Sequence, residues 1–372
     1  MPRIALFAYS FLPGQGGGEQ YNITLASGLV QSGEEVFVIT PQKAGGNDSL
    51  PFPVIRIRSG IIESLIDMYR NLKEIKPDLL HISGPTPIDY LIIPFAKVAQ
   101  IPIILTYHAD FPSHFGQFLN RLIFIFGRGF TRILVQTERD RQNLIKRGIK
   151  EKQIIAFPFN GVDERVFRKI NHEDRDIDLL FIGKMDREHS YKGHWKLLEI
   201  IKEVRKGKGA SFSICIVGGG QDLPEFIEKS IREELNLIIE TNLSDDELVL
   251  LLNRAKTIIL PSTSNAEGFG RVILEALFCG VVPILSKYAG SSEIVRKYGT
   301  GAIIDPFDIE GTAKVITDLL SDDTKLSEFR INTTKMLSDG PFTINRTVKE
   351  TVDIYREVIE QYQAHTRLKK LF

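Results

Sequence analysis

The sequence predicts an α/β protein built from two doubly wound domains, and three observations support this. The chain has 372 residues, more than one ordinary hydrophobic core requires and a comfortable length for two domains. Apolar runs of strand length alternate with amphipathic stretches of helix length along nearly the whole chain. A polar, aperiodic segment at Arg168–Asp176 interrupts this alternation, and we interpret it as a hinge.

The first half of the chain predicts a parallel sheet that is covered on both faces, because its strand runs are continuously apolar rather than alternating. We expect these strands at Ile4–Ala8, Glu35–Ile39, Val54–Ile57, Leu79–Ile82, Ile103–Thr106, Arg132–Val135 and Ile154–Phe157. Helices are expected between them at Gln20–Ser32, Ser64–Glu74, Ile88–Gln100, Phe115–Gly129 and Glu138–Arg147.

The second half repeats the pattern. Its strands are expected at Leu179–Ile182, Ser213–Val217, Leu237–Glu240, Thr257–Leu260, Val282–Leu285 and Ala302–Ile304. Its helices are expected at Trp195–Lys206, Leu223–Glu234, Asp245–Ala255, Arg271–Phe278, Ser292–Lys297 and Ile309–Leu320. We therefore expect a Rossmann-like domain over residues 1–168 and a second over 177–340, facing each other across a cleft. In the final segment, 341–372, a helix at Ile344–Gln363 would cross back onto the first domain.

Composition indicates a soluble protein of a reducing compartment. Lys plus Arg and Asp plus Glu both total 47, so no net charge directs the chain toward nucleic acid. The two cysteines, Cys215 and Cys279, lie in apolar runs without the spacing of a disulfide framework or a zinc site. Apolar runs fall short of the ~18 residues that span a bilayer. We expect a cytoplasmic protein, with peripheral attachment to the inner face of the membrane as an alternative.

Glycines and lysines follow several of the predicted strands. Gly16–Gly18 follow the first strand and Gly218–Gly220 follow the strand at Ser213–Val217, but neither cluster has the GxGxxG spacing of a dinucleotide site. Lys184 and Lys192 flank a polar loop after the strand at Leu179–Ile182, where two cations can hold a diphosphate. Taken singly, flexible turns and solvated lysines account for the same residues.

The most informative segment runs from Pro261 to Leu277. A strand leads into a polar loop that ends at Glu267, followed by Gly268-Phe269-Gly270 and a helix that carries Glu275. Carboxylates bind sugar hydroxyls, and backbone N–H groups at a helix start suit a diphosphate. An acidic residue near a helix start is also common for structural reasons alone.

This pattern, with two glutamates eight residues apart around Gly-Phe-Gly, resembles the family-four glycosyltransferases of the "glycosyl transferases group 1" type. Further segments agree with that family in order along nearly the whole chain. They are Gly17-Gly18, Lys76-Pro77-Asp78, Thr106-Tyr107-His108, Asn160-Gly161-Val162-Asp163, Gly183-Lys184, Lys192-Gly193, Cys279–Pro283 and Gly290–Ile294. The resemblance implies the GT-B fold, in which two Rossmann-like domains face each other.

The resemblance also implies roles for individual residues. Lys184 and Lys192 would neutralise the donor diphosphate, Glu267 would hold donor-sugar hydroxyls, and Glu275 would hold those of the ribose. Gly17, Gly18, Gly183, Gly218, Gly268, Phe269 and Gly270 would contact the donor, and His108 would stand beside the transferred sugar. The family commonly has Arg where Lys184 stands, so a bidentate phosphate contact becomes a point charge.

The implied activity is transfer of a hexosyl group, with retained configuration, from a UDP- or GDP-sugar to a lipid or glycan acceptor in cell-envelope polysaccharide or glycolipid synthesis. The acceptor would bind the first domain. No cofactor or metal is expected, because the Asp-x-Asp pattern of Asp174, Asp176 and Asp178 precedes a strand instead of following it.

Three alternatives remain open. A nucleotide-sugar epimerase of the same fold would carry additional acid–base carboxylates and histidines in its cleft, whereas a non-catalytic sugar-nucleotide-binding protein would lack the full set of site residues. Phe118–Arg147 combines an apolar run with basic flanks, which suits peripheral contact with an anionic membrane. A core helix with a solvated basic edge also accounts for that segment, and we favour this second interpretation.

Overall fold

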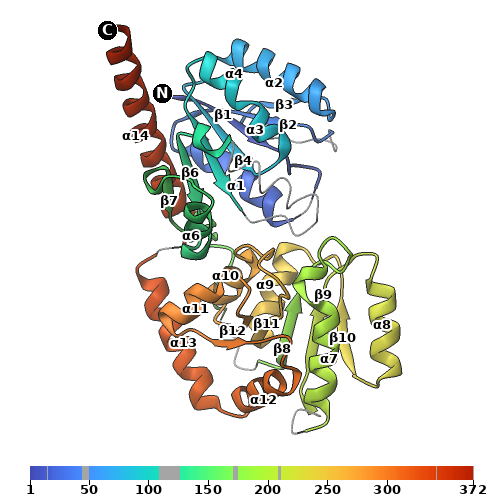
Figure 1. Ribbon diagram of the computed structural model, residues 1–372. Coiled ribbons are helices and arrows are strands. Elements are labelled where there is room, and N and C mark those ends of the chain that lie inside the picture. Colours follow the sequence, from blue (N-terminus) through green and yellow to red (C-terminus); the bar gives the residue numbers. More distant parts are fainter. Residues whose placement is uncertain are drawn as a thin grey trace. The chain divides into compact units, whose positions relative to one another are not determined.

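The computed structural model describes residues 1–14, 16–43, 50–108, 126–170, 175–207, 211–340 and 342–371, with the side chains of Pro87, Ile88 and 368–371 left out. The chain divides into two compact units: unit 1 comprises Met1–Gly161 and Phe342–Phe372, and unit 2 comprises Val162–Pro341. Within the described ranges the strands form two parallel sheets, one of seven strands and one of six (Figure 1).

Unit 1 is an α/β layer structure whose sheet has the strand order β3-β2-β1-β4-β5-β6-β7. Its strands are β1 (Arg3–Ala8), β2 (Glu35–Thr40), β3 (Val54–Arg56), β4 (Leu79–Gly84), β5 (Ile103–Tyr107), β6 (Arg132–Val135) and β7 (Ile154–Ala156). Its helices are α1 (Gly17–Gln31), α2 (Ile61–Ile75), α3 (Pro87–Leu91), α4 (Ile93–Val98), α6 (Glu138–Lys146) and α14 (Ile344–Leu371). Single 3-10 turns lie at Gly127–Gly129 and Glu151–Gln153.

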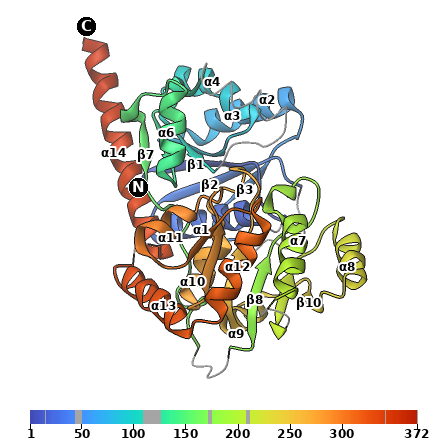
Figure 2. The ribbon, with the colours of Figure 1, turned by 60° about the horizontal axis from the view of Figure 1, so that its bottom comes forward.

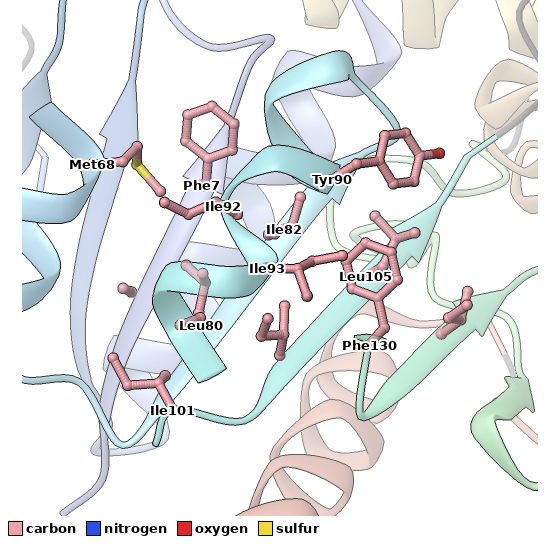
Figure 3. Packing of buried hydrophobic residues seen from close by; sticks show 14 of the residues in the cluster. Phe7, Met68, Leu80, Ile82, Tyr90, Ile92, Ile93, Ile101, Leu105 and Phe130 are labelled. Carbon is pink, nitrogen blue, oxygen red and sulfur yellow. The ribbon is translucent and has the colours of Figure 1, made fainter. Parts of the chain in front are cut away.

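Both faces of this sheet are buried, as the continuous apolar runs predict. Phe7, Leu80, Ile82 and Leu105 point to one face, where they pack with residues of α2, α3 and α4 (Figure 3). Alternate strand residues point to the other face, which is covered by α1 and α14. From α14, Val348, Val352, Tyr355, Val358 and Ile359 are buried in this second cluster, so the last helix belongs to the core of unit 1.

Unit 2 repeats the parallel α/β arrangement with the strand order β10-β9-β8-β11-β12-β13. Its strands are β8 (Ile177–Ile182), β9 (Ile214–Val217), β10 (Leu237–Glu240), β11 (Ala255–Leu260), β12 (Val282–Ser286) and β13 (Ala302–Ile304). Its helices are α7 (His194–Arg205), α8 (Leu223–Arg232), α9 (Asp245–Arg254), α10 (Arg271–Phe278), α11 (Ser292–Tyr298), α12 (Ile309–Leu320) and α13 (Asp323–Ser338), with a 3-10 turn at Ser190–Lys192. Helices α7 and α12 pack side by side over one hydrophobic cluster (Figure 2).

The α/β fold and nearly all expected elements are confirmed, with two corrections. The single helix expected at Ile88–Gln100 is two short helices, α3 and α4, and Pro94 stands in the first turn of the second, where its missing N–H is tolerated. Helix α13 was not expected. The helix expected at Phe115–Gly129 lies outside the described residues up to residue 125, and Gly127–Gly129 is a 3-10 turn.

Candidate functional site

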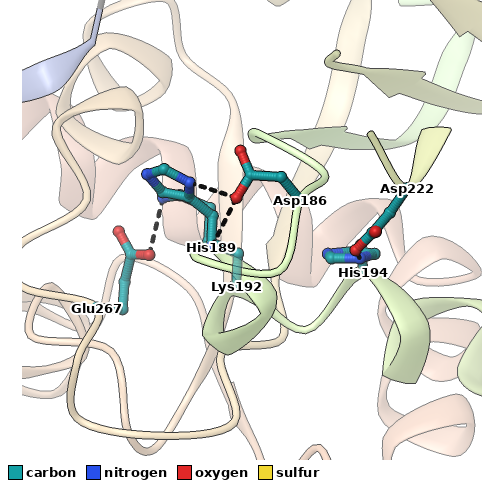
Figure 4. Close-up of polar contacts among 6 residues, drawn as sticks. All are labelled: Asp186, His189, Lys192, His194, Asp222 and Glu267. Atoms are coloured by element: carbon teal, nitrogen blue, oxygen red, sulfur yellow. Dashed lines mark hydrogen bonds and ion pairs between the residues drawn. The ribbon is translucent and has the colours of Figure 1, made fainter. Parts of the chain in front are cut away.

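The strand order of unit 2 reverses between β8 and β11, and ligands of open parallel sheets bind at the carboxyl ends of the strands at such a point. The loops that leave these two strands carry Lys192 and Glu267. Their side chains form an ion pair, with Lys192 Nζ 2.8 Å from Glu267 Oε2 (Figure 4). The pair is mostly buried, since the side chains are only 19% and 6% exposed. Two residues 75 positions apart are thus brought together at the expected edge of the sheet.

The electrostatics of Lys192 keep it charged. Burial by itself would lower the pKa of Lys192, but the Glu267 carboxylate and the nearby Tyr191 hydroxyl outweigh burial and raise it. Burial, reinforced by the charge of Glu267, raises the pKa of Tyr191 to about 12, so that hydroxyl is neutral at pH 7. A lysine that stays cationic at pH 7 can donate to a phosphate oxygen in place of Glu267.

Glycines allow the loops of this edge to touch one another through their backbones. A Cβ on Gly218 would lie 2.1 Å from the Gly183 carbonyl oxygen, and one on Gly193 would lie 2.0 Å from that of Pro261. Gly193 also has a φ of +80°, which disfavours other residues. The Thr263 N–H donates to the Tyr191 carbonyl at 2.8 Å, which fixes the Lys192 loop against the Glu267 loop.

Helix α10 begins directly after this loop, with Gly270 at its N-cap in the left-handed region. One turn into the helix, Arg271 Nε donates to Glu275 Oε1 at 3.0 Å, and both side chains are nearly buried. Burial raises the pKa of Glu275, and Arg271 partly offsets this. Phe269 is buried beside the helix start, whereas Gly268 accepts a hydrogen bond from the Gly290 N–H.

Lys184 stands apart from this group. Its side chain is exposed, and within the described ranges it forms no hydrogen bond or ion pair with another residue. The structure therefore joins Lys192 to Glu267 but leaves Lys184 solvated at the start of the same loop.

Three neighbours of the site, Arg271, Asp186 and His189, were not predicted from the sequence. Arg271 is the partner of Glu275, and their spacing of four residues on a helix was a readable signal. Asp186 Oδ1 lies 2.7 Å from His189 Nδ1 in the loop between the two lysines (Figure 4). This pair is local, three residues apart, and the charge pattern of an irregular loop gave no reason to single it out.

In unit 1 the order of the strands reverses between β1 and β4, and the remaining predicted site residues lie at this edge. His108 follows β5, and its Nε2 is 2.9 Å from the Ser83 hydroxyl at the end of β4. Tyr21 of α1 meets the His108 ring edge-on at 4.9 Å between centroids. Gly17 and Gly18 begin α1, and a Cβ on Gly17 would meet nothing within 4 Å.

A second histidine, His81, lies behind this edge in a buried hydrogen-bond network. Its Nε2 is 2.6 Å from the Thr106 hydroxyl, and its Nδ1 contacts the Tyr355 hydroxyl of α14. The Tyr21 hydroxyl also reaches Thr106, at 3.2 Å. Desolvation lowers the pKa of His108 to about 4 and that of His81 to about 3, with the charge of His108 adding to the latter. Both imidazoles are therefore neutral at pH 7.

Both units of the chain match models of known protein families. Residues 162–336 match the family "Glycosyl transferases group 1", and residues 15–166 match "Glycosyltransferase Family 4". The two matches overlap at residues 162–166 and together run from residue 15 to residue 336. The chain belongs to the group 1 glycosyltransferases.

The curated relatives agree with this assignment. The sulfoquinovosyl transferase SQD2 of Arabidopsis thaliana is 24% identical over 79% of this chain and 62% of its own length. The D-inositol 3-phosphate glycosyltransferase of an Arthrobacter strain is 22% identical over 93% of this chain and 91% of its own. This chain spans 53 and 57% of two uncharacterized glycosyltransferases of Methanocaldococcus jannaschii.

The crystal structure of Anabaena HepE in complex with UDP-glucose superposes with a TM-score of 0.78 at 18% identity, covering 95% of this chain and 100% of that one. This likeness establishes the GT-B fold for the group 1 chain.

The segment predicted as a membrane contact falls partly outside the described residues, which begin again at residue 126. In the described part, Arg132 donates to Gln361 of α14, and Arg141 binds Glu138 and Glu151. Across the described ranges, no helix combines the length and apolarity required to cross a bilayer. Of the Asp-x-Asp residues, Asp176 pairs with Arg254 and Asp178 pairs with Lys256, whereas Asp174 is not described.

Proposed function

We propose that this group 1 glycosyltransferase moves a hexosyl group from a nucleoside diphosphate sugar to a lipid or glycan acceptor, with retention of anomeric configuration and without a metal ion. The observation that carries the proposal is the buried Lys192–Glu267 ion pair at the switch point of the unit 2 sheet, beside the start of α10. The solved structures of HepE with UDP and with UDP-glucose support a nucleotide-sugar donor for this fold.

The ion pair explains how the site holds two buried charged groups. A buried charge without a partner is strongly destabilising, and here each group serves as the other's partner. A bound donor would offer replacements: its diphosphate would take Lys192, and its sugar hydroxyls would take Glu267. Glu275, held by Arg271, would receive the ribose hydroxyls in the same way.

The chemical step mainly requires stabilisation of the leaving group. The bond between the anomeric carbon and the β-phosphate oxygen breaks, and a bond from that carbon to the acceptor oxygen forms. The acceptor proton passes to the departing phosphate. Lys192, Lys184 and the first backbone N–H groups of α10 would neutralise the negative charge that develops on the diphosphate.

In unit 1, His108 would act as a neutral hydrogen-bonding group. A protonated imidazole beside an oxocarbenium-like transition state would oppose its positive charge, and the low pKa of His108 prevents this at neutral pH. Its hydrogen bond with Ser83 and its edge contact with Tyr21 fix the ring.

A donor-hydrolysis assay tests this proposal without knowledge of the acceptor, because water replaces it. We expect slow release of UDP or GDP from one matching donor in the presence of EDTA, and ¹H NMR at early times should show the α-anomer of the free sugar from an α-linked donor. Glu267→Gln should lower the rate at least tenfold, whereas Glu225→Gln, which alters an exposed carboxylate on α8, should leave it unchanged. Release of the β-anomer would contradict retention, and no release from any donor would contradict the activity.

One observation favours a second candidate, the nucleotide-sugar epimerase. The Asp186–His189 pair is an additional carboxylate and histidine at the donor edge, which is what an epimerase would use for proton transfer. Incubation of the protein with a UDP-sugar in D₂O without acceptor distinguishes the two: an epimerase would exchange a sugar C–H for deuterium, and the proposed transferase would not.

A further inference from the structure

A cavity of unit 2 lies away from the donor edge. It has a volume of about 830 Å³ and is bordered by Lys169, Arg175, Lys256 and Gly280 on one side and by α13 on the other. Arg175 precedes β8, Lys256 is near the start of β11, and Gly280 precedes β12. These three strands are neighbours in a parallel sheet, so the cavity is at their amino ends, opposite the edge that carries Lys192 and Glu267. We call it the α13 pocket.

The α13 pocket is cationic. One face of α13, with residues at helical spacing from Asp323 through Leu326 to Arg330, forms its wall. Lys256 is engaged by Asp178 at 2.8 Å. Within the described ranges, the other lining cations, Lys169, Arg175 and Arg330, form no ion pair with a carboxylate, and Asp323 is the acidic residue of the lining.

The two arginines donate to backbone carbonyls, which carry no formal negative charge. Arg175 donates to the carbonyls of Leu252, Ala255 and Cys279, the last at 2.7 Å, and Arg330 donates to that of Gly280 at 3.3 Å. Gly280 has a φ of +75°, and a Cβ there would lie 3.1 Å from an Arg175 nitrogen. The turn at Cys279–Gly280 therefore brings both guanidinium groups to the pocket wall.

This arrangement lowers the pKa of both arginines. Burial, with the charge of Arg330 adding to it, lowers the pKa of Arg175 to about 10. Burial also lowers the pKa of Arg330, and Asp323 offsets this in part. Two half-buried guanidinium groups that repel each other are relieved by an anion placed between them.

We propose that the α13 pocket is a binding site for a soluble molecule that carries a phosphate or diphosphate group, separate from the donor site. Guanidinium groups match phosphate oxygens in geometry, and Lys169 at the rim adds a point charge. The cavity lies in the volume range of small-molecule sites, so it has room for more than the anion itself.

Isothermal titration calorimetry with inorganic pyrophosphate at constant ionic strength tests the proposal. We expect a saturable binding component in the wild type that persists in Lys192→Ala, which changes the donor site. Lys169→Gln should weaken this component roughly tenfold, as the loss of one charge-assisted contact predicts, and Lys169→Gln with Arg330→Gln should abolish it. Lys325→Gln, which removes an exposed cation of α13 outside the pocket, should have no effect.

Lys169 is exposed, so its substitution keeps the fold and the test does not depend on the arginine variant. Pyrophosphate binding that is lost in Lys192→Ala but unchanged in Lys169→Gln would place the anion at the donor site and overturn the proposal. The absence of binding in the wild type at millimolar pyrophosphate would do the same. If the protein binds phosphatidic acid vesicles and excess pyrophosphate does not release it, the proposal of a soluble ligand is overturned. None of these three results bears on the donor-hydrolysis assay.

Discussion

Lys192 and Glu267 illustrate how single residues determine what the donor edge can bind. The Lys192 and Glu267 side chains are only 19% and 6% exposed, and they form an ion pair at 2.8 Å. Removal of one partner would leave a buried charge, which typically destabilises a protein by about 3–5 kcal/mol. A donor that offers a phosphate to one and hydroxyls to the other can replace this pair without leaving either group unsatisfied.

The buried histidines of unit 1 have the opposite property, because they are held in the neutral form. His108 has an ordinary pKa of 6.5 that falls to about 4 in the folded protein, and His81 falls from 6.5 to about 3. Unfolding therefore takes up protons at pH values between these limits. The stability contributed by neutral burial is fully present above pH 6.5 and is lost as the pH falls toward 4.

We expect the free energy of unfolding of unit 1 to decrease on acidification from pH 7 to pH 5, by up to about 1.4 kcal/mol per pH unit for each histidine. Urea unfolding at several pH values measures this. His108→Gln should reduce the slope, because the unfolded chain then binds one proton fewer. An identical slope in the variant would show that His108 titrates normally in the folded protein.

At the scale of elements, the loops after β8, β9 and β11 act as one backbone-packed unit. Gly218 lies against the Gly183 carbonyl, whereas its neighbour Gly219 faces open space. The two glycines therefore provide a matched pair in which only one has a packing role.

Gly218→Ala should force the β8 and β9 loops apart and displace the loop that carries Lys192. We expect a stability loss of about 1–3 kcal/mol and at least tenfold weaker nucleotide binding, whereas Gly219→Ala should change stability by less than about 0.5 kcal/mol. Thermal unfolding and nucleotide titration of the two variants measure this. Equal stability and equal nucleotide affinity of the two variants would contradict close packing of these loops.

The strands were predictable because the central strands of each sheet are buried on both faces, which makes them mostly apolar runs. The helices were less predictable from the sequence than the strands. The run at Ile88–Gln100 reads as one helix by periodicity, and Pro94 divides it. Helix α13 escaped prediction because it buries only Leu326, Phe329, Thr333 and Met336 and contains the weak helix formers Asn332, Thr333 and Thr334.

The candidate site likewise has one part that could be predicted from the sequence and one part that could not. Residues within one sequence motif, such as Glu267 and Glu275, could be singled out because the motif resembles that of a known family, and the parallel-sheet rule predicts the edge at which they lie. Their roles stay predictions. Contacts that depend on loop conformation, such as Asp186 with His189, and the cationic pocket beside α13 had no sequence signal. Their members come from segments that are far apart or locally irregular.

At the scale of the whole molecule, the chain folds as two compact units, and the chain returns to the first unit through α14. This helix supplies five buried apolar side chains to unit 1, and its Tyr355 contacts His81. Unit 2 has a separate hydrophobic core. The stability of unit 1 should therefore depend on the last 30 residues, whereas unit 2 should not.

A chain that ends at Gly340 should lose the unfolding transition of unit 1 and keep that of unit 2. The truncation exposes the face of the unit 1 sheet that α1 and α14 cover together. Differential scanning calorimetry resolves the two transitions. A chain that ends after Ala364 keeps all five buried apolar side chains of α14, which end at Ile359, and serves as the control. Two intact transitions in the Gly340 truncation would contradict this role of α14.

Nucleotide binding by unit 2 is the most direct test of a donor site built around Lys192, Glu267 and Glu275. Thermal shifts of the wild type and of Glu275→Ala would be measured with UDP, GDP and their sugars, with EDTA and with Mg²⁺. We predict that one nucleotide raises the Tm of the wild type, by mass action and independently of metal, and that it leaves Glu275→Ala unchanged. No shift with any nucleotide at millimolar concentration, or an equal shift in the variant, would contradict the donor site.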